Sequence, residues 1–465
     1  MSSARVIAIF DIGKTNKKLF LFDEQYNIVW ENNRVLNEKE DEDGDPCENL
    51  RALNNWVRES LIKSKKRTNF DICAINFSAY GASFVHVGEN GEILTPLYNY
   101  LKPYPEKLKK QFYDQYGGEL TFSMLTASPV LGSLNSGMQL YRIKNEKPEV
   151  FERIKYSLHL PQYLSWLHTG KAFSEISSIG CHTNLWNFSQ QHYHEWVYRE
   201  GVIDKFPPIQ SAGTVHPAVP PAIKMSAPIF PDLIAGTGLH DSAAAMIPYL
   251  ESFPDPFILI STGTWCISMN PFNTEPLTIA ELKSDCLCYM TNKGQPMKSS
   301  RLFAGHDHEI QVGRLAVRFQ KDNKYYQTVQ YNTDIVKRLH TMQDIRTFNQ
   351  SSPMVSASVF AQRDISIYNS FEEAYHRLIM DIMEQQLIST KLLLTHAIKR
   401  IFVDGGFGKN PVYMNLLAAA FPSIEVFSAT INQASAIGAA MAIHPHWNRL
   451  PLPTDIVILK PYKPL

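Results

Sequence analysis

Three stretches decide the fold: FDIGKTNKK at residues 10–18, ISTGTW at residues 260–265 and IFVDGGFGKN at residues 401–410. In each, a short apolar run typical of a buried strand leads into a turn rich in glycine, threonine or asparagine. Such turns let backbone N–H groups come close to a ligand phosphate. Three of them, far apart along the chain, predict two α/β lobes that close on one nucleotide.

Length and charge narrow the class of protein. The 465 residues exceed what one core usually contains, so two domains are expected. Lys+Arg and Asp+Glu both total 45, which argues against electrostatic binding to nucleic acid or to a membrane surface. No apolar run nears the roughly 18 residues that span a bilayer, and residues 6–10 are too short for a signal peptide core. We therefore expect a cytoplasmic protein; its oligomeric state stays open.

Local patterns predict the elements around the turns. In the first half we expect a three-stranded meander, a helix, an apolar strand and a hairpin at residues 5–30, 48–64, 71–78 and around 89–91. Residues 105–205 read as mostly helical. In the second half we expect a strand-turn-strand unit at residues 257–270, a helix at 371–400 and a strand at 400–404. A helix at 411–420 and a small-residue helix at 434–443 follow. This order predicts two related α/β lobes, although no residue-by-residue repeat is visible.

Other conspicuous stretches are interpreted as structural. The acidic run 38–45 lacks the spacing of a calcium loop and predicts a solvated loop. The prolines of residues 206–235 indicate an extended surface stretch leading to a domain boundary. Cys286 and Cys288 have no second pair to complete a zinc site. A metal site at His306, His308 and Glu309 is also disfavoured, because no suitably spaced partner is evident.

Two aspartates are candidates for the chemistry of phosphoryl transfer. Asp11 ends the first strand beside a polar turn, which suits a hydrated Mg²⁺ that bridges phosphates; the alternative is an aspartate that caps a hairpin. Asp241 follows Gly238 and His240 and precedes the alanines 243–245. It can cap a helix, or accept the proton of an alcohol during transfer. The alanines let this helix pack very close to a neighbour.

Two later turns are candidates for binding the nucleotide. Ser261 to Thr264 combine hydroxyls with Gly263 and resemble a phosphate-cradling hairpin, although a plain strand turn fits as well. Gly405 and Gly406 would let adenine and ribose lie against the backbone, and Asn410 could bond an edge of the nucleotide. Neither a Walker loop nor a G-x-G-x-x-G fingerprint is present.

The order of these segments resembles that of the FGGY carbohydrate kinases over nearly the whole chain. The order is Asp-turn, Pro-rich stretch, H-D-S-A-A-A, S-T-G-T-W and D-G-G-x-x-x-N, with greatest specificity at residues 238–265 and 402–410. Residues 134–136 (LNS) and 160–164 (LPQYL) are similar to the rhamnulokinase and fuculokinase branch.

The resemblance implies a fold and a set of roles. The fold is α/β, with two ribonuclease H-like, actin-type lobes and a central cleft, sugar binding at residues 1–238 and nucleotide binding at residues 239–465. Asp241 would be the catalytic base and Asp11 the Mg²⁺ residue, with ATP as the other cofactor. The matching nucleotide residues are Gly13, Lys14, Thr15 and Asn16 in the first turn, with Lys18 as an anion partner, then Thr262, Gly263, Thr264, Gly405, Gly406 and Asn410.

The sugar side departs from the family pattern. Relatives carry an Asp and an Arg where this chain has residues 98–103 (YNYLKP), and Gln162 stands where they often have Asp. The substrate is expected to be a ketose such as L-rhamnulose or L-fuculose, or a related polyol, but the sequence does not name it. The candidate substrate residues are Tyr80, His86, Asn135, His240 and Asp241, and core packing explains Phe84 equally well.

Two other functions compete with a sugar kinase. The altered residues 98–102 would fit a non-catalytic sensor that binds ATP and a sugar, whereas the retained Asp241 argues for catalysis. An actin- or Hsp70-like ATPase acting on protein is disfavoured, because no separate peptide-binding domain follows the two lobes. Sugar-stimulated phosphoryl transfer would distinguish the kinase from the sensor. Filament formation with ATP would favour the actin- or Hsp70-like ATPase.

Overall fold

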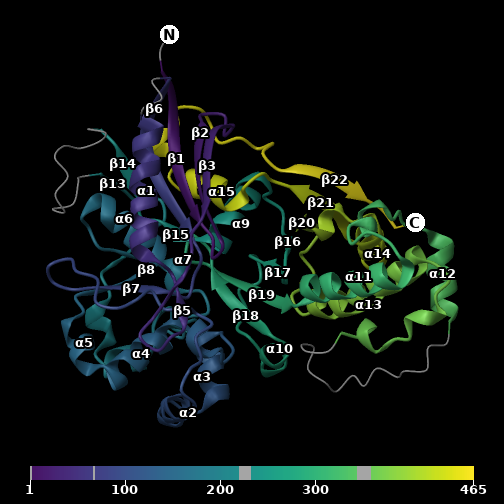
Figure 1. Cartoon of the computed structure of the whole chain (residues 1–465), viewed down its shortest axis with the longest axis horizontal. Helices are drawn as coiled ribbons and strands as arrows, with labels where there is room; N and C mark the ends of the chain where they lie inside the picture. The colour runs from purple at the N-terminus through teal and green to yellow at the C-terminus, as the bar shows by residue number, and fades with distance from the viewer. Residues whose placement is uncertain (1–2, 66–68, 219–231, 343–357, 465) are drawn as a thin grey trace. The chain divides into compact units, whose positions relative to one another are not determined.

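The computed structural model describes residues 3–65, 69–218, 232–342 and 358–464, which form two compact units (Figure 1). The first unit comprises Met1–Ser252, Cys288–Pro296 and Asn432–Ile456, and the second Phe253–Leu287, Met297–Ile431 and Val457–Leu465. Both are mixed α/β, as predicted. The division of binding roles between residues 1–238 and 239–465 stays a prediction.

The first unit contains a mixed sheet in the order β13-β14-β6-β1-β2-β3, with β15 beside β6. The predicted meander and apolar strand are confirmed, since β1 pairs antiparallel with β2, β2 with β3, and β1 parallel with β6. The strands are β1 (Ala4–Ile12), β2 (Asn16–Asp23), β3 (Ile28–Val35), β6 (Phe70–Ala79), β13 (Val215–Pro217), β14 (Ile234–Gly236) and β15 (Leu239–His240).

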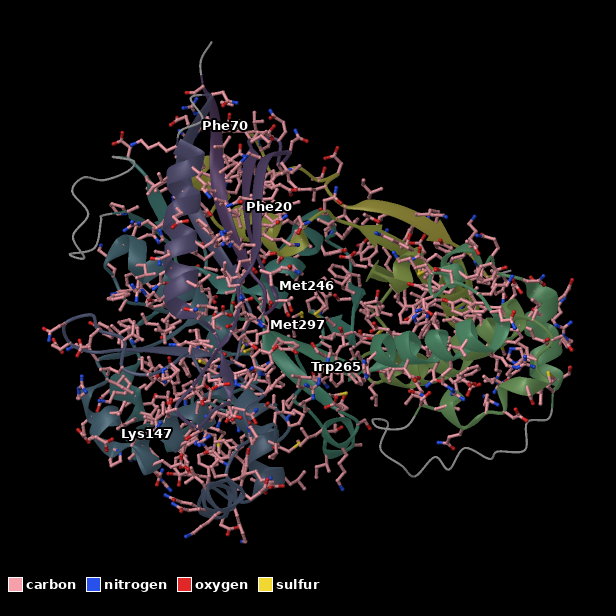
Figure 2. The ribbon with its side chains drawn as sticks, in the orientation of Figure 1. Phe20, Phe70, Lys147, Met246, Trp265 and Met297 are labelled. Carbon is pink, nitrogen blue, oxygen red and sulfur yellow. The ribbon has the colours of Figure 1, made fainter. Side chains whose placement is uncertain are left out.

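One core of this unit lies between the sheet and α1 (Leu50–Lys65). Apolar residues at helical spacing give α1 a buried face, on which Trp56 meets Phe10 of β1 edge-on at 5.7 Å. Leu19 and Leu21 of β2 belong to this core, while Phe20, labelled in Figure 2, is buried on the opposite face of the sheet. The small strands β4 (Lys39–Glu40) and β5 (Pro46–Cys47) pair antiparallel, and residues 41–45 of the acidic run connect them.

A second core is built by the predicted helical stretch. Its helices are α2 (Glu106–Gln115), α3 (Glu119–Thr126), α4 (Ser136–Glu146), α5 (Pro148–Arg153), α7 (Ile176–Ile179) and α8 (Glu195–Arg199). The helix α6 (Leu160–Thr169) of the same stretch packs into the first core. The hairpin expected around residues 89–91 differs from prediction. The chain does turn there, but β7 (Phe84–Val87) takes β8 (Tyr156–His159) as its ladder partner, and Val87 forms only an isolated bridge with Ile93.

The second unit has a sheet in the order β18-β19-β17-β16-β20-β21-β22. Its strands are β16 (Phe257–Thr262), β17 (Cys266–Asn270), β18 (Cys286–Met290), β19 (Pro296–Leu302), β20 (Arg400–Gly405), β21 (Glu425–Thr430) and β22 (Ile458–Tyr462). Its helices include α10 (Ile279–Lys283), α11 (Ala304–Phe319), α12 (Thr333–Thr341), α13 (Phe371–Lys391) and α14 (Pro411–Ala420). The helix expected over 371–400 therefore ends at Lys391.

The two sheets share one pairing scheme. The series β3-β2-β1-β6-β14 corresponds to β19-β17-β16-β20-β21, with two antiparallel pairs followed by two parallel pairs in each case. This correspondence supports the predicted relationship between the lobes at the level of topology.

Two small-residue helices cross closely in the first unit. A Cβ placed on Gly438 of α15 (Ala434–Ala442) would lie 1.8 Å from the carbonyl oxygen of Ala244 on α9 (Asp241–Ser252). The expectation that the alanine-rich helix packs very close to a neighbour is therefore confirmed. No helix in the described ranges is both long and apolar enough to cross a membrane. Most prolines of the predicted boundary lie at 219–231, outside the described residues.

Candidate active site

Three neighbouring strands of the first unit bring Asp11 and Asp241 to one edge of the sheet. Asp11 pairs with Ser78 in the β1–β6 register, and His240 pairs with Ala79 in the β15–β6 register. All three strands run parallel, so the end of β1 and the start of α9 flank the end of β6. The sequence placed these two aspartates in different segments, and the sheet topology makes them neighbours.

Asp241 has one oxygen engaged and one available. Its Oδ1 accepts hydrogen bonds from the backbone N of Ser242 at 2.6 Å and from Ser242 Oγ at 3.3 Å, and His240 Nε2 lies 3.2 Å away. Its Oδ2 accepts no hydrogen bond from the described residues, and the side chain is 33% exposed. Burial raises the pKa of this carboxyl to about 6, which is suitable for a base near neutral pH.

His240 is a neutral neighbour of this carboxylate. Burial lowers its pKa to about 4, and the ring lies against Gly81, where an added Cβ would be 2.9 Å from Nε2. Gln162 supports the same segment, because its Nε2 donates to the carbonyl oxygen of Gly238 at 2.8 Å. The residue that departs from the family pattern thus holds the loop that precedes Asp241.

Asp11 is a suitable ligand for a divalent cation. Burial and then the negative charge of Asp241 raise its pKa to about 6, while Ser435 Oγ donates to Oδ1 at 3.1 Å. Two carboxylates that face each other disfavour their own ionisation, and a cation relieves that repulsion. Mg²⁺ prefers one or two carboxylates together with phosphate oxygens and waters. The donor set present at Asp11 therefore fits the predicted ion.

The first predicted phosphate turn follows Asp11 directly. Gly13 N donates to Asn16 O at 3.0 Å and closes the turn, and Thr15 and Asn16 are exposed. The side chain of Lys14 pairs with Glu38 at 2.5 Å, and Lys18 donates to Gln433 Oε1 at 3.0 Å. Lys18 therefore has a protein partner rather than a free ammonium group.

The other two predicted turns meet in the second unit. Thr262 Oγ1 donates to Asp404 O at 2.6 Å and accepts from Phe407 N at 3.0 Å, while Gly406 N donates to Thr262 O at 3.1 Å. Gly405 has φ +89°, and a Cβ there would lie 2.0 Å from Thr262 O. Only glycine allows this close approach of the two strand ends.

A cavity of about 510 Å³ lies beside these turns. Five predicted residues line it: Thr262, Gly263, Thr264, Gly406 and Asn410. The sequence analysis missed most of its other wall, which comes from α11 and the following loop and includes Gly305, His308, Glu309, Val312, Asn323, Lys324 and Tyr326. His308 and Glu309 were considered only as metal ligands. Together with Gly305 and Val312 they follow the i, i+3, i+4, i+7 spacing that places residues on one side of a helix.

Asn410 has a structural role in addition to the predicted hydrogen bond to an edge of the nucleotide. Its Oδ1 caps α14 by accepting from Val412 N and Tyr413 N, and its Nδ2 donates to Tyr375 OH at 2.7 Å. Tyr375 OH in turn lies 2.9 Å from His308 Nε2, and burial lowers the pKa of that histidine to about 4. These three side chains are therefore neutral and held in place by their own hydrogen bonds.

The candidate substrate residues separate into two groups. Tyr80 lies at the end of β6 near the two aspartates, with its ring 6.0 Å from that of Tyr100. His86 is buried against Ser157, and burial lowers its pKa to about 3. Asn135 is fully buried and bonds Leu131 N, Ser128 Oγ and two carbonyl oxygens. The placement of His86 and Asn135 does not support contact with a substrate.

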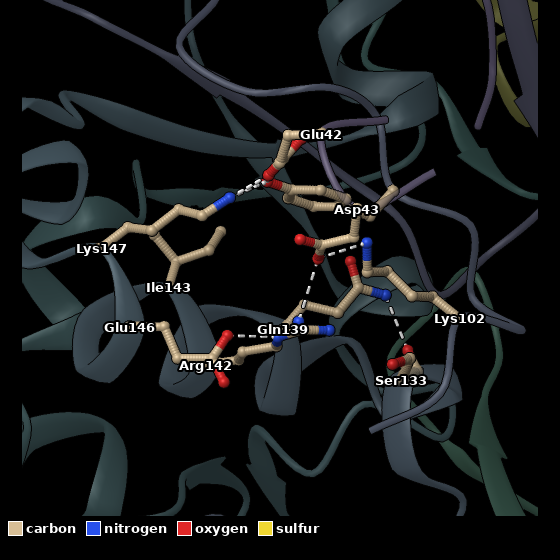
Figure 3. Close-up of a pocket in the computed structure, with 10 residues that line it drawn as sticks. Glu42, Asp43, Lys102, Ser133, Gln139, Arg142, Ile143, Glu146 and Lys147 are labelled. Atoms are coloured by element: carbon tan, nitrogen blue, oxygen red, sulfur yellow. Dashed lines mark hydrogen bonds and ion pairs between the residues drawn. The ribbon is translucent and has the colours of Figure 1, made fainter. Parts of the chain in front are cut away.

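The acidic run differs from the solvated loop that we expected. Lys102 Nζ lies 2.5, 2.8 and 3.1 Å from carboxylate oxygens of Asp41, Asp43 and Asp45, and Asp41 is buried. Figure 3 shows the pair that Lys102 forms with Asp43. Backbone N–H groups and this ammonium lower the pKa of Asp41. Tyr98 also bonds Glu42. The altered residues 98–103 therefore make an internal ionic cluster with the acidic run, which is a structural explanation of the departure.

The two mixed sheets, with their matching strand order, define a fold of the actin-type ATPase class. The model for the FGGY family of carbohydrate kinases, N-terminal domain, matches residues 6–248, and that for the carbohydrate kinase FGGY C-terminal domain matches residues 254–450. The chain belongs to the FGGY family of carbohydrate kinases. It is thus an ATP-dependent sugar kinase.

Individual relatives are distant. Rhamnulokinase of Halalkalibacterium halodurans is 21% identical over 95% of this chain and 91% of its own length, and that of Oceanobacillus iheyensis is 22% identical over 81% and 79%. The crystal structure of a carbohydrate kinase from Novosphingobium aromaticivorans has a TM-score of 0.80 at 24% identity, covering 100% of this chain and 95% of that one. Ligand-bound xylulose kinase from Lactobacillus acidophilus gives 0.77 at 16%, covering 99% and 94%. The structural likenesses show the fold alone.

Proposed function

We propose that this protein transfers the γ-phosphoryl group of ATP to a hydroxyl of a ketose or related polyol, with Asp241 as the general base. L-Rhamnulose is the first substrate to test, because the curated relatives are rhamnulokinases, and L-fuculose is the second. The observation that carries the proposal is the free Oδ2 of Asp241 beside Asp11, at the ends of parallel strands.

The transfer step follows from the residues at this edge. Oδ2 of Asp241 accepts the proton of the substrate hydroxyl as that oxygen forms a bond to the γ-phosphorus. The bond between the γ-phosphorus and the β–γ bridging oxygen breaks, and its electron pair leaves with ADP. Oδ1 keeps its bonds from Ser242 throughout, which holds the carboxylate in place. The backbone N–H groups of Lys14 and Thr15 would stabilise the phosphoryl charge.

Asp11 would hold Mg²⁺, directly or through water. When bound, the ion would neutralise phosphate charge during transfer. The role of Asp11 is to offer a carboxylate that is already anchored through Ser435.

The first experiment measures ADP release with Mg-ATP against L-rhamnulose, L-fuculose, L-ribulose and D-xylulose. Strong turnover with one ketose would support the proposal and name its substrate. If protein that binds ATP turns over none of them, the non-catalytic sensor becomes the better interpretation. The ionic cluster of Lys102 with Asp41, Asp43 and Asp45 is compatible with either outcome, because its charged groups pair with one another.

Asp241→Asn tests the role of the base. Loss of the proton acceptor should lower kcat by about 10²–10⁴-fold while ATP affinity stays within about two-fold. Asp71→Asn is the matched control, because Asp71 is an exposed aspartate on β6 of the same sheet. A nearly active Asp241→Asn enzyme would refute the assignment.

A further inference from the structure

Lys17 is a buried cation beneath the first phosphate turn. It is 1% exposed, and its Nζ donates to Gly13 O at 2.9 Å, to Lys14 O at 2.9 Å and to Glu48 Oε2 at 2.8 Å. These contacts use all three N–H groups of the ammonium. The neighbouring Lys14 differs, because its side chain leaves the turn and pairs with the more exposed Glu38. Of these two lysines, only Lys17 acts on the backbone of the turn.

The carbonyl orientation determines where the amide groups of the turn point. In a planar trans peptide, the N–H of the next residue points opposite to the carbonyl oxygen. The carbonyls of Gly13 and Lys14 both face the buried ammonium. The N–H groups of Lys14 and Thr15 therefore face away from it, and neither donates to another group in the described part of the chain. Two unpaired amides on one side of a turn form a site for anionic oxygens.

Glu48 connects this turn to the end of β6. It is 2% exposed and accepts both from Lys17 and, at 3.2 Å, from Tyr80 OH. Tyr80 N donates to Ile12 O at 3.1 Å, so the tyrosine is fixed beside the strand that carries Asp11. The buried pair thus joins the turn to the edge of the sheet where the two aspartates lie.

Stability alone does not explain a buried ion pair. Removing two charges from water costs so much that a well-packed apolar pair is often as stable or more so. An apolar pair, however, leaves the carbonyls of Gly13 and Lys14 without their donor, and the two peptide groups are then free to rotate. The specific contribution of the pair is therefore the orientation of the turn.

We propose that Lys17, held by Glu48, is a positioning residue that aims the amides of Lys14 and Thr15 at the terminal phosphate of ATP. The terminal phosphate is the part concerned because the turn directly follows Asp11, which neighbours the base Asp241. This inference rests on the proposed kinase function for its ligand. Neither Lys17 nor Glu48 touches substrate; both act through the backbone of the turn.

The test compares two nucleotides on Lys17→Met combined with Glu48→Gln, which removes the charges together and leaves no buried ion unpaired. Titration calorimetry measures the affinity for AMP-PNP, which has a terminal phosphate, and for ADP, which lacks one. Two misaimed hydrogen bonds to a charged group should weaken AMP-PNP binding by about ten-fold or more, with ADP within about two-fold. Lys298→Met combined with Glu281→Gln is the control and should keep the AMP-PNP preference. Lys298 is likewise a buried lysine, with Nζ 2.8 Å from Glu281 Oε1 and 3.4 Å from Pro276 O, but it lies on β19 of the second unit.

Three results would overturn the proposal: equal loss for both nucleotides, unchanged affinity for AMP-PNP, or the same loss in the control that combines Lys298→Met with Glu281→Gln. If the double variant does not fold, Glu48→Gln alone carries the comparison, since it is nearly isosteric and should lower AMP-PNP affinity selectively but less. These binding measurements need no turnover, so a protein that phosphorylates none of the sugars still gives an answer. Failure of the kinase proposal and failure of the positioning proposal are thereby separated.

Discussion

The two units fix their phosphate turns by different means, although their sheets pair alike. In the first unit, charged side chains determine the turn after β1: Lys17 and Glu48 are buried beneath it. In the second unit, the turns after β16 and β20 hold each other through Thr262 and through glycine contacts that leave no room for a side chain. Duplication of a topology therefore did not duplicate the local interactions that present the amide groups.

This contrast predicts unequal tolerance to added side chains. The first unit's turn is less crowded. A Cβ on Gly13 would lie 3.2 Å from Asn16 O, a tight contact that a shift of a few tenths of an ångström relieves, whereas one on Gly405 would lie 2.0 Å from Thr262 O at a positive φ.

The largest effect is expected for Gly405→Ala. Backbone strain and the overlap with Thr262 O should together lower the free energy of unfolding by about 3 kcal/mol and weaken ADP binding. Gly13→Ala should cost less than about 1 kcal/mol. Chemical denaturation and ADP titration of the two variants provide the measurement. Equal losses at the two glycines would remove the proposed difference between the turns.

A smaller effect is expected for Thr262→Val. Valine keeps the shape but loses the hydroxyl that joins Asp404 O to Phe407 N. Loss of both hydrogen bonds should cost about 1–3 kcal/mol of unfolding free energy. Thr15→Val, in the exposed first turn, should change that free energy by less than about 0.5 kcal/mol. If Thr262→Val proves as stable as Thr15→Val, the hydroxyl does not hold the second unit's turns together.

The smallest effect on stability concerns pH. The pKa of Asp241 is raised to about 6, so the folded state favours its protonated form. Protonated Asp241 therefore contributes to stability at low pH, and this contribution is lost as the pH rises through about 6. Relative to the unmodified protein, Asp241→Asn should have a free energy of unfolding about 1 kcal/mol higher near pH 8 and equal near pH 4. Thermal unfolding of both proteins across this range gives the comparison.

Activity should show the complementary pH dependence. In the unmodified enzyme, kcat/KM should fall about ten-fold per pH unit below pH 6, as the base becomes protonated. ADP binding to the second unit should stay flat from about pH 6 to 8, because His308 in its cavity wall has its pKa lowered to about 4. A stability of Asp241→Asn that parallels the unmodified protein at every pH would contradict the raised pKa.

Sequence reasoning found the strands and turns better than it found what surrounds them. Apolar runs ending in glycine or aspartate located β1, β16 and β20, because a buried strand and its turn are local features. The neighbourhood of Asp11 and Asp241 depends on β6 lying between their strands, and one sequence does not give that register. The family resemblance supplied the pairing that local pattern lacked.

Long-range polar partners were the main limit. Asn135 and His86 are polar residues near promising segments, but each is satisfied or enclosed within the interior. The acidic run looked solvated because its partner, Lys102, lies 57 residues beyond Asp45 in the sequence. A run of like charges predicts exposure only if no oppositely charged residue from a distant part of the chain pairs with it. The local sequence does not show whether such a partner exists.

The crossing of α9 and α15 has a consequence for how the protein is made. The first unit begins at the start of the chain, yet residues 432–456 complete it, with Gly438 set against Ala244. Almost the whole second unit must therefore be synthesised before the first unit can complete its fold. Until then, the faces of β1 and β6 that α15 covers remain uncovered. Contacts between residues so far apart in the sequence slow folding and prolong the exposure of apolar surface that promotes aggregation. The fold that unites two ATPase halves thus makes the earlier half depend on the later one for its completion.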